Sequence, residues 1–389
     1  MTILLTGADG YIGWPTALRI ADRTDDRVVL VDNFARREWV EEVGSVSATP
    51  IVGIDTRLEA AREVHGLDNL SFVEGDLTER SFVDELLAVH EPDTVVHTAA
   101  QPSAPYSQIN GERANYTQHN NLQATRNLLW GLEEHDLTDT HFVETTTTGV
   151  YGAPEFPIPE GGTTMENQGE RDEVPFPNMS GSWYHTTKSN DAANMRLANQ
   201  QFDIPISDVR TAIVYGTETE ETRADDRLKT RFDFDYYFGT VGHRFCAQAV
   251  AGYPVTVYGK GEQRKPLVSL EDAVEGLAQL ATSDPDERPD DLVVYNQVTR
   301  AISIVEVANT IADVGNEFDL NVTVEHFENP RDEDETHKME IENDRYADLI
   351  DGQSQTFESG IRDVFETIIQ YRDTIEAHED RFLPGVLEE

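Results

Sequence analysis

The chain has 389 residues, and its 74 acidic side chains against 30 Lys and Arg give a formal net charge of −44. This charge argues against nucleic acid as a partner, because no basic stripe is present to neutralise phosphates. The only cysteine, Cys246, excludes internal disulfides and a Cys-rich metal centre, so we expect no metal. Met1 leads directly into an apolar strand instead of a signal-peptide pattern, and no apolar run approaches the ~20 residues of a membrane span. We therefore expect a cytoplasmic protein with no membrane partner.

Acidic residues are spread along the whole chain instead of being concentrated in a few loops. Repulsion among them would oppose folding in dilute buffer, but molar salt shortens the Debye length to ~3 Å and removes most of that repulsion. The composition therefore indicates a halophilic protein, adapted to a salt-rich cytosol.

In the first half, short apolar runs alternate with amphipathic stretches, a pattern typical of βαβ units and a parallel sheet. The expected strands are Thr2–Leu5, Val28–Val31, Leu70–Val73, Thr94–His97, His141–Thr145 and Ile204–Val209. The helices expected between them are Tyr11–Asp22, Ser81–Val89, Tyr116–Glu134 and Ser182–Gln201. Two long interruptions cover residues 34–65 and 153–177. The second is rich in Pro, Gly and Glu, so we expect it to be a loop over the site.

After Gly216 the pattern becomes less regular. We expect a strand at Val255–Tyr258 and helices at Leu270–Ala281, Ile304–Val314 and Ile361–Ile375. The predicted fold is α/β, a Rossmann-like doubly wound parallel sheet with a smaller C-terminal substrate domain. Residues 1–215 are expected to form the Rossmann-like, dinucleotide-binding domain. Residues 216–389 would form mainly the substrate domain, with some segments returning to the first domain.

A glycine-rich turn follows the first predicted strand, where residues 6–13 read Thr-Gly-Ala-Asp-Gly-Tyr-Ile-Gly. Glycines at this place let the backbone amides that open a helix approach a pyrophosphate closely. Asp32 ends the second strand, where a carboxylate can bind the adenosine ribose and repel a 2′-phosphate. This favours NAD over NADP, although Arg36 and Arg37 lie close enough to weaken the preference. The alternative is an acidic strand end in an acid-rich protein.

Two further strand ends lie where a doubly wound sheet binds its ligand. Gly75-Asp76-Leu77 follows the third strand and would meet the adenine. Thr98-Ala99-Ala100 follows the fourth strand, and its small side chains would let the cofactor pass.

A tyrosine and a lysine four residues apart, Tyr184 and Lys188, share one face of a predicted helix. A lysine ammonium lowers the pKa of a neighbouring tyrosine, so a phenolate can take the proton of a sugar hydroxyl during oxidation. Thr147, just past the fifth strand, would hold that hydroxyl in line. The alternative for this pair is an ordinary surface helix.

Together these residues resemble the extended short-chain dehydrogenase/reductases that act on nucleotide sugars, and more closely the UDP-sulfoquinovose synthase family. The matching segments are Gly10-Tyr11-Ile12-Gly13-Trp14, Val31-Asp32-Asn33, Ser103-Ala104-Pro105-Tyr106-Ser107, Thr117-Gln118-His119-Asn120-Asn121, Tyr184-His185, Phe238-Gly239-Thr240, Arg244-Phe245-Cys246, Thr256-Val257-Tyr258-Gly259-Lys260-Gly261 and Asn329-Pro330-Arg331.

The resemblance implies that UDP-glucose and sulfite, free or from a sulfite-delivering protein, give UDP-sulfoquinovose while NAD is reduced and regenerated. It implies Thr147, Tyr184 and Lys188 as catalytic residues and a homodimer built on the helices Tyr116–Glu134 and Ser182–Gln201. The implied cofactor-binding residues are Gly7, Gly10, Tyr11, Ile12, Gly13, Asp32, Asn33, Arg36, Asp76, Leu77, Ala99, Ala100, Asn121, Tyr184, Lys188 and Val214. The implied substrate-binding residues are Gln101, Thr147, Tyr184, His185, Thr211, Thr240, Arg244, Thr256, Val257 and Arg331.

Several alternatives stay open at this point. A UDP-glucose 4-epimerase or another NAD-dependent nucleotide-sugar enzyme needs the same Thr, Tyr and Lys but no sulfite. A sugar 4,6-dehydratase is disfavoured, because Thr148-Gly149 replaces the Asp-Glu pair that such enzymes place after the catalytic Thr. Pro102, Val150 and Arg210-Thr211-Ala212 depart from the synthase pattern, which leaves room for another sugar or nucleophile.

Overall fold

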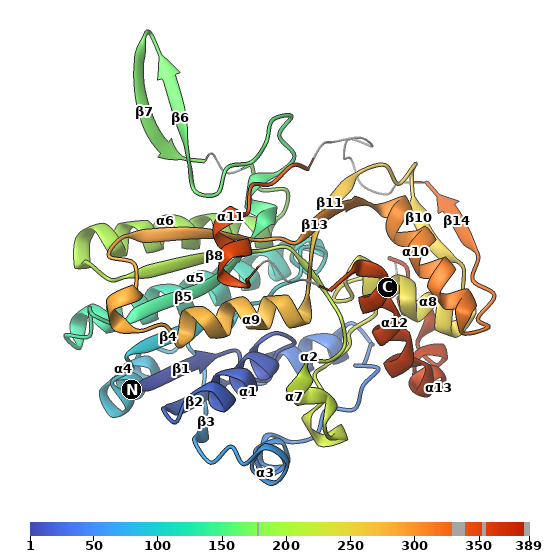
Figure 1. The fold of residues 1–389 in the computed structure, drawn as a ribbon, viewed down its shortest axis with the longest axis horizontal. Coiled ribbons are helices and arrows are strands. Elements are labelled where there is room, and N and C mark those ends of the chain that lie inside the picture. The colour runs from blue at the N-terminus through green and yellow to red at the C-terminus, as the bar shows by residue number, and fades with distance from the viewer. Residues whose placement is uncertain (177–178, 329–338, 352–354, 385–389) are drawn as a thin grey trace.

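A seven-stranded parallel sheet forms the centre of the computed structural model, which describes residues 1–176, 179–328, 339–351 and 355–384 (Figure 1). The strand order is β12-β8-β5-β4-β1-β2-β3. Their bounds are β1 Thr2–Thr6, β2 Arg27–Asp32, β3 Leu70–Glu74, β4 Thr94–His97, β5 His141–Thr147, β8 Ile206–Thr211 and β12 Leu292–Gln297. The prediction of a Rossmann-like parallel sheet is confirmed.

Helices cover both faces of the sheet, and neighbouring residues of one strand pack against opposite layers, as the period of two in a strand requires. On β1, Leu4 packs with one layer, while Ile3 and Leu5 pack with the other. The first layer is α4 Arg80–His90, α5 Gly111–Glu134 and α6 Trp183–Phe202. The second is α1 Gly13–Arg23, α3 Ile54–His65 and α9 Leu270–Ala281.

Side-chain caps fix where two of these helices begin. Asn110 accepts a hydrogen bond from the Arg113 amide at 3.0 Å and starts α5, several residues earlier than the apolar pattern predicts. Ser182 accepts one from the His185 amide at 3.0 Å and starts α6. Since polar caps satisfy amides that have no partner within the helix, they set the start independently of the apolar residues. The cap at Ser182 places Tyr184 in the first turn of α6.

The two long interruptions contain regular structure that the sequence did not predict. Residues 34–65 hold the helix α2 Ala35–Glu42 as well as α3. Within 153–177, β6 Gly162–Asn167 pairs with β7 Glu170–Pro175 as an antiparallel hairpin that stands away from the body of the molecule (Figure 1). The prediction of a loop there was wrong for this stretch. Both strands are mostly exposed, so they lack the apolar alternation by which a strand is predicted.

The C-terminal part has its own core, to which Phe245, Ile311 and Phe365 contribute. Around it lie the helices α8 Val241–Ala251, α10 Ile304–Glu317, α12 Phe357–Ile368 and α13 Arg372–Glu376. The helix expected at Ile361–Ile375 is divided between α12 and α13. Small sheets complete this part: β9 Ile213–Tyr215 with β11 Arg264–Ser269 and β13 Arg300–Ser303, and β10 Val255–Tyr258 with β14 Val324–Phe327. Strand β12 returns to the main sheet and pairs with β8.

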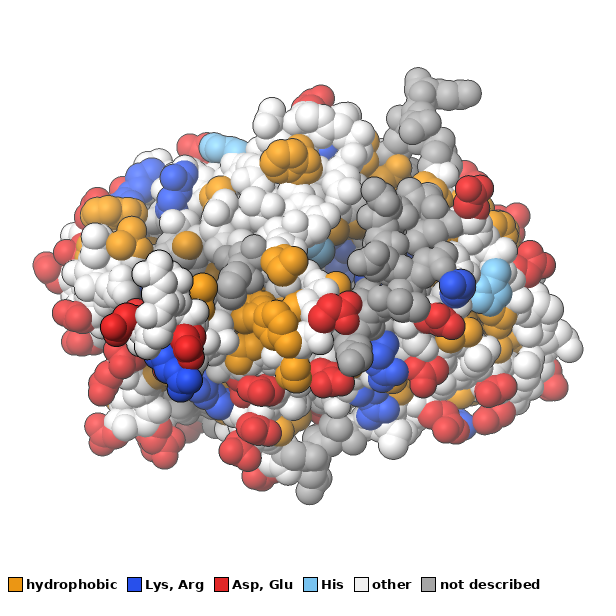
Figure 2. Space-filling view, turned by 90° about the horizontal axis from the view of Figure 1, so that it is seen from above, with side chains coloured by type: hydrophobic (Ala, Val, Ile, Leu, Met, Phe, Trp, Pro, Cys, Tyr) orange, Lys and Arg blue, Asp and Glu red, His pale blue; other side chains and the backbone are white. Residues whose placement is uncertain are grey.

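Acidic side chains surround the face seen in Figure 2 instead of forming one patch. In the part of the chain that the structure describes, no helix has the length and apolar character needed to cross a membrane.

Candidate active site

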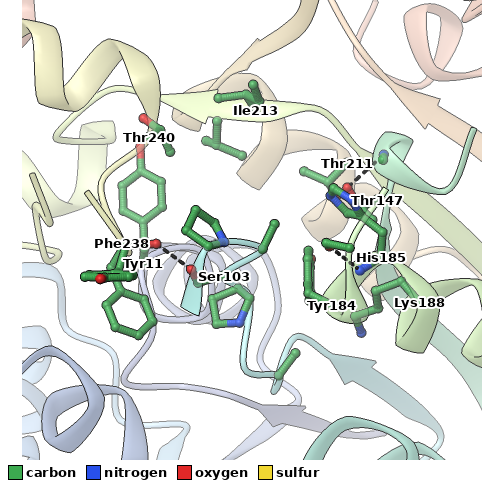
Figure 3. Close-up of a pocket in the computed structure, with 18 of the residues that line it drawn as sticks. Tyr11, Ser103, Thr147, Tyr184, His185, Lys188, Thr211, Ile213, Phe238 and Thr240 are labelled. Carbon is green, nitrogen blue, oxygen red and sulfur yellow. Dashed lines mark hydrogen bonds between the residues drawn. The ribbon is translucent and has the colours of Figure 1, made fainter. Parts of the chain in front are cut away.

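A cavity of about 1630 Å³ lies at the carboxyl ends of the central strands, between the sheet and the C-terminal part (Figure 3). Its lining comes from the turns after β1, β2, β4 and β5, from the start of α6, and from β9, α8 and β11. The cavity is larger than the ~300–1,000 Å³ of an ordinary small-molecule site, so it has room for a dinucleotide together with a nucleotide sugar.

The glycine turn forms a cradle that side chains would fill. Gly7 has a φ of +76°, and a Cβ there would lie 2.7 Å from the Ala99 nitrogen. A Cβ at Gly13 would lie 2.1 Å from the Gly7 carbonyl oxygen. Neither distance is tolerable, so only glycine permits this close approach of β1, β4 and α1. The exposed backbone in the turn fits a pyrophosphate.

Asp32 lines the cavity at the end of β2 and is held by backbone amides. It accepts hydrogen bonds from the Asp9 amide at 2.8 Å and from the Phe34 amide at 2.7 Å. Burial raises the pKa of its carboxyl to about 6, against the opposing effect of these hydrogen bonds. The carboxyl group is thus fixed in place and ionised at neutral pH, as a ribose hydroxyl requires.

The arginines that could have accommodated a 2′-phosphate are held by buried carboxylates. Arg37 makes two hydrogen bonds of 2.7 Å to Asp9, and Arg57 makes another at 2.8 Å. Arg36 pairs with Asp233 at 2.6 Å and lies over the Phe238 ring at 4.1 Å. These ion pairs favour a cofactor without the 2′-phosphate, in agreement with the effect expected of Asp32.

The three residues predicted to be catalytic lie together at the other end of the cavity (Figure 3). Thr147 ends β5, and its hydroxyl accepts a hydrogen bond from the Gly149 amide at 3.1 Å. Tyr184 and Lys188 lie on the first turns of α6. Burial raises the pKa of Tyr184, and the positive charge of Lys188 opposes that rise. The lysine therefore acts in the predicted direction, but burial outweighs it.

Lys188 is buried against two carboxylates. Its Nζ lies 2.9 Å from Glu144 Oε1 on β5 and 3.6 Å from Asp191 Oδ2 on α6. Burial alone would lower the pKa of Lys188, but the charges of Glu144 and Asp191 outweigh it and raise the pKa. The lysine is therefore held as an ammonium.

His185 follows Tyr184 and also lines the cavity. Burial, assisted by the charge of Lys265, lowers its pKa to about 4, so the imidazole is neutral at physiological pH. A Cβ at Gly149 would lie 2.3 Å from His185 Nε2, which explains a glycine at that position. The His185 Nδ1 is buried without a hydrogen-bond partner among the described residues.

Most of the predicted site residues line this cavity. Apart from those described above, they are Gly10, Tyr11, Ile12, Asn33, Asp76, Leu77, Ala99, Ala100, Val214, Thr211, Thr240, Arg244 and Thr256.

Four predicted residues lie elsewhere. Asn121 and Gln101 are buried behind the wall, where the Asn121 carboxamide binds both backbone groups of Gln101, at 2.8 and 3.1 Å. Val257 packs in the C-terminal core. Arg331 lies outside the described residues.

The structure also brings in charged residues that the sequence reasoning missed. Lys265 on β11 lines the cavity, and Glu144 and Asp191 contact Lys188, which also lines it. Arg57 pairs with Asp9 within the glycine turn. A signal existed for two of them. The chain has very few lysines, which singles out Lys265 as it does Lys188, and Glu144 is an acidic residue inside an otherwise apolar or hydroxylated strand.

Comparison with known proteins agrees with this geometry. The sequence pattern of the NAD dependent epimerase/dehydratase family matches residues 3–295. The chain is 36% identical to the UDP-sulfoquinovose synthase of Sulfolobus acidocaldarius, over 99% of this chain and 96% of that protein. It is 35% identical to the chloroplastic UDP-sulfoquinovose synthase of Spinacia oleracea, over 99% of this chain and 78% of that protein. The chain belongs to the UDP-sulfoquinovose synthase branch of this family.

Among solved structures, the UDP-glucuronic acid 4-epimerase of Bacillus cereus, in complex with UDP-glucuronic acid and NAD, superposes with a TM-score of 0.69. It is 20% identical and covers 95% of this chain and 99% of its own, so this similarity shows the shared fold alone. The cofactor of the family is NAD. The glycine cradle and the Asp32 carboxyl fit that cofactor.

Proposed function

We propose that this protein converts UDP-glucose and sulfite into UDP-sulfoquinovose. The observation that carries the proposal is the identity of about 35% to two UDP-sulfoquinovose synthases along nearly the whole chain. The intact set of Thr147, Tyr184 and Lys188 in one cavity supports it. An epimerase is the less supported reading, because the sequence similarity to epimerases is weaker: the UDP-glucose 4-epimerase of Halalkalibacterium halodurans is 28% identical over 42% of this chain.

In the proposed reaction, the glycine cradle and Asp32 would hold NAD, which would supply hydride acceptor and donor chemistry for sugar C4. Tyr184 takes the proton of the C4 hydroxyl, and the Lys188 ammonium stabilises the phenolate that does so. Thr147 holds the hydroxyl in line. Arg244 and Lys265, which both line the cavity, supply positive charge for the diphosphate.

The C4 ketone makes the C5 hydrogen acidic. Loss of that proton and of the C6 hydroxyl releases water and leaves a double bond between C5 and C6. Sulfite then forms the carbon–sulfur bond at C6, and C5 takes up a proton. Neutral His185 lies beside Tyr184 and is our candidate for handling one of these protons or for contacting sulfite.

The reaction is tested by incubating the purified protein at molar salt with UDP-glucose, with and without sulfite, and identifying the nucleotide sugars by mass spectrometry. We expect a sulfonated product only when sulfite is present. UDP-galactose formed equally well in both samples would identify an epimerase instead.

We further propose a homodimer built on α5 and α6. Three of the leucines on the predicted interface helix, Leu128, Leu129 and Leu132, pack inside the subunit and are not available for it. Other large apolar side chains on these helices are exposed: Trp130 by 49%, Trp183 by 55% and Leu197 by 51%.

Light scattering at molar salt tests this dimer. We expect Leu197→Glu to give a monomer, whereas Val89→Glu on α4, which changes another exposed apolar residue, should leave a dimer. A monomeric parent protein would refute the proposal.

We also propose that folding and activity require molar salt. With a net charge of −44, lowering the salt lengthens the Debye length from ~3 Å at 1 M to ~10 Å at 0.1 M and restores long-range repulsion. The melting temperature should fall as salt is withdrawn. An unchanged melting temperature and full activity in dilute buffer would contradict the proposal.

A further inference from the structure

Beneath Tyr184 and Lys188 lies a group of charged side chains that has no role in the proposed reaction. Glu144 on β5 and Asp191 on α6 are fully buried, and both face Lys188. Since both lie within 3.6 Å of the same Lys188 nitrogen, the two carboxyl groups are close neighbours, and each raises or lowers the pKa of the other. Two carboxylates in contact inside a protein repel strongly, and a single ammonium compensates only one of them.

The oxygens of Glu144 and Asp191 also have few hydrogen-bond donors. Glu144 Oε1 is paired with Lys188 at 2.9 Å, but no well-directed hydrogen bond from the described residues reaches Glu144 Oε2 or either Asp191 oxygen. A buried ionised carboxylate needs several donors to be stable, and among the described residues this pair has only Lys188 and the Thr125 hydroxyl close by. A single proton between the two groups would convert the repulsion into a hydrogen bond and leave one negative charge opposite the ammonium.

Among the residues that the structure describes, no second cation forms an ion pair with Glu144 or Asp191. Strand β8 presents Asp208 beside Glu144, and that carboxylate is paired with Arg210 at 2.9 Å. Strand β4 presents His97, which burial and then Lys188 keep neutral by lowering its pKa well below the ordinary value. Helix α5 contributes the Thr125 hydroxyl, a neutral group that lies close to Asp191 and also bonds His97 at 3.2 Å. On α6 the facing groups are Lys188 and Tyr184.

We propose that Glu144 and Asp191 are a proton-sharing carboxyl pair, and that they act as positioning residues that fix the Lys188 ammonium beneath Tyr184. The closer contact to the ammonium places the negative charge on Glu144 and the proton mainly on Asp191. Burial and contact with Glu144, which raise the pKa of Asp191 well above its ordinary value, agree with this arrangement. The pair delivers one counter-charge to Lys188, which holds its proton without being drawn away from the phenolate it must stabilise.

Infrared spectroscopy of the parent protein tests for the shared proton, and this test does not depend on the proposed reaction. At alkaline pH, where ordinary carboxyl groups are ionised, we expect a carbonyl band of a protonated carboxyl group. That band should move when aspartate, glutamate or both carry a ¹³C carboxyl label. Absence of a labelled protonated band would overturn the proposal, and it would do so without bearing on the function.

Variants test the positioning role, which rests on the assigned roles of Tyr184 and Lys188. Glu144→Gln or Asp191→Asn leaves one carboxylate, which then ionises, so each should abolish the infrared band. The rate of UDP-glucose oxidation should rise with pH as Tyr184 ionises, and each single variant should move the apparent pKa of that rise by less than about half a unit. The double variant leaves the ammonium buried without a counter-charge, so Lys188 loses its proton and no longer stabilises the phenolate. We therefore expect the apparent pKa to increase by about one unit or more and the rate at neutral pH to fall about tenfold or more.

The matched control is Glu221→Gln, which removes a buried carboxylate paired with Arg19 at 2.6 Å far from the sugar end of the cavity. It should keep both the band and the pH profile while it changes the melting temperature. Equal shifts in the two single variants that add up in the double variant would mean that both groups are ionised, and would overturn the proposal.

Discussion

The two ends of the cavity differ in how many cations face each buried carboxylate. At the cofactor end, each of two buried carboxylates faces two guanidinium groups: Asp9 with Arg37 and Arg57, and Asp233 with Arg36 and Arg231. At the sugar end, a single ammonium, Lys188, faces two carboxylates.

The difference follows from what each end must do. Arginine keeps its charge at any physiological pH, so paired guanidinium groups hold the charges at the cofactor end fixed. Carboxyl groups in excess of their cation share protons instead, and a site that can share protons suits acid–base chemistry. In this acid-rich chain, several of the arginines are concentrated at the cofactor end. Changes at the cofactor end should alter binding and stability, whereas changes at the sugar end should alter the chemical step.

The largest effect is expected at the sugar end, for Tyr184→Phe. The variant keeps the ring and its packing but removes the group that accepts the C4 proton. Loss of a general base typically lowers the rate by about 10²–10⁴-fold. Stopped-flow measurement of cofactor reduction should show this loss, with NAD and UDP-glucose affinities close to those of the parent. Near-parental turnover would mean that another group is the base.

Asp9→Ala should have the next largest effect, on stability. It leaves two guanidinium groups without their shared partner, and Arg57 among them is buried. Removing one member of a buried ion pair costs about 3–5 kcal/mol, because an uncompensated charge stays behind. Arg37→Ala is the matched control, since Asp9 keeps Arg57 and the loss should be much smaller. Denaturant unfolding at molar salt measures both, and equal losses would contradict the idea of a shared carboxylate.

A smaller effect is expected for Asp32→Asn, on NAD binding. A hydrogen bond to a charged group contributes about 1.5–3 kcal/mol, so the dissociation constant should rise about tenfold to a hundredfold. In the parent, NAD binding should weaken as pH falls through about 6, because the pKa of Asp32 is raised to about 6 and only the carboxylate accepts both ribose hydroxyls. Calorimetric titration across this range checks it. The variant should lose the pH dependence, and a parent that binds NADP as tightly as NAD would disprove the role of Asp32.

The sequence could predict the parts of the site that follow one another along the sheet, but not the contacts that form between distant segments. The glycine turn, Asp32, Thr147, Tyr184 and Lys188 follow one another at spacings that a doubly wound sheet fixes, so their convergence on one cavity was predictable. Contacts between distant segments were not. The pairing of Asp9 with Arg57 and of Lys188 with Glu144 depends on which faces meet after folding.

Some information in the sequence went unused. Thr256 and Val257 are neighbours on β10, and neighbouring residues of a strand point to opposite faces. Only one of them could line the cavity, and it is Thr256. The exposed hairpin of β6 and β7 gave no such signal, because neither of its faces is buried in the subunit.

One measurement tests the central claim most directly: that a single site oxidises the sugar at C4, admits sulfite at C6 and reduces C4 again. The protein is supplied at molar salt with UDP-glucose deuterated at C4, together with sulfite, and the product is analysed by mass spectrometry and NMR. We expect a UDP-sugar that carries a sulfonate on C6 and retains the deuterium on C4, because the cofactor returns the hydride that it took. A deuterium-labelled UDP-galactose without sulfur, formed regardless of sulfite, would contradict the account.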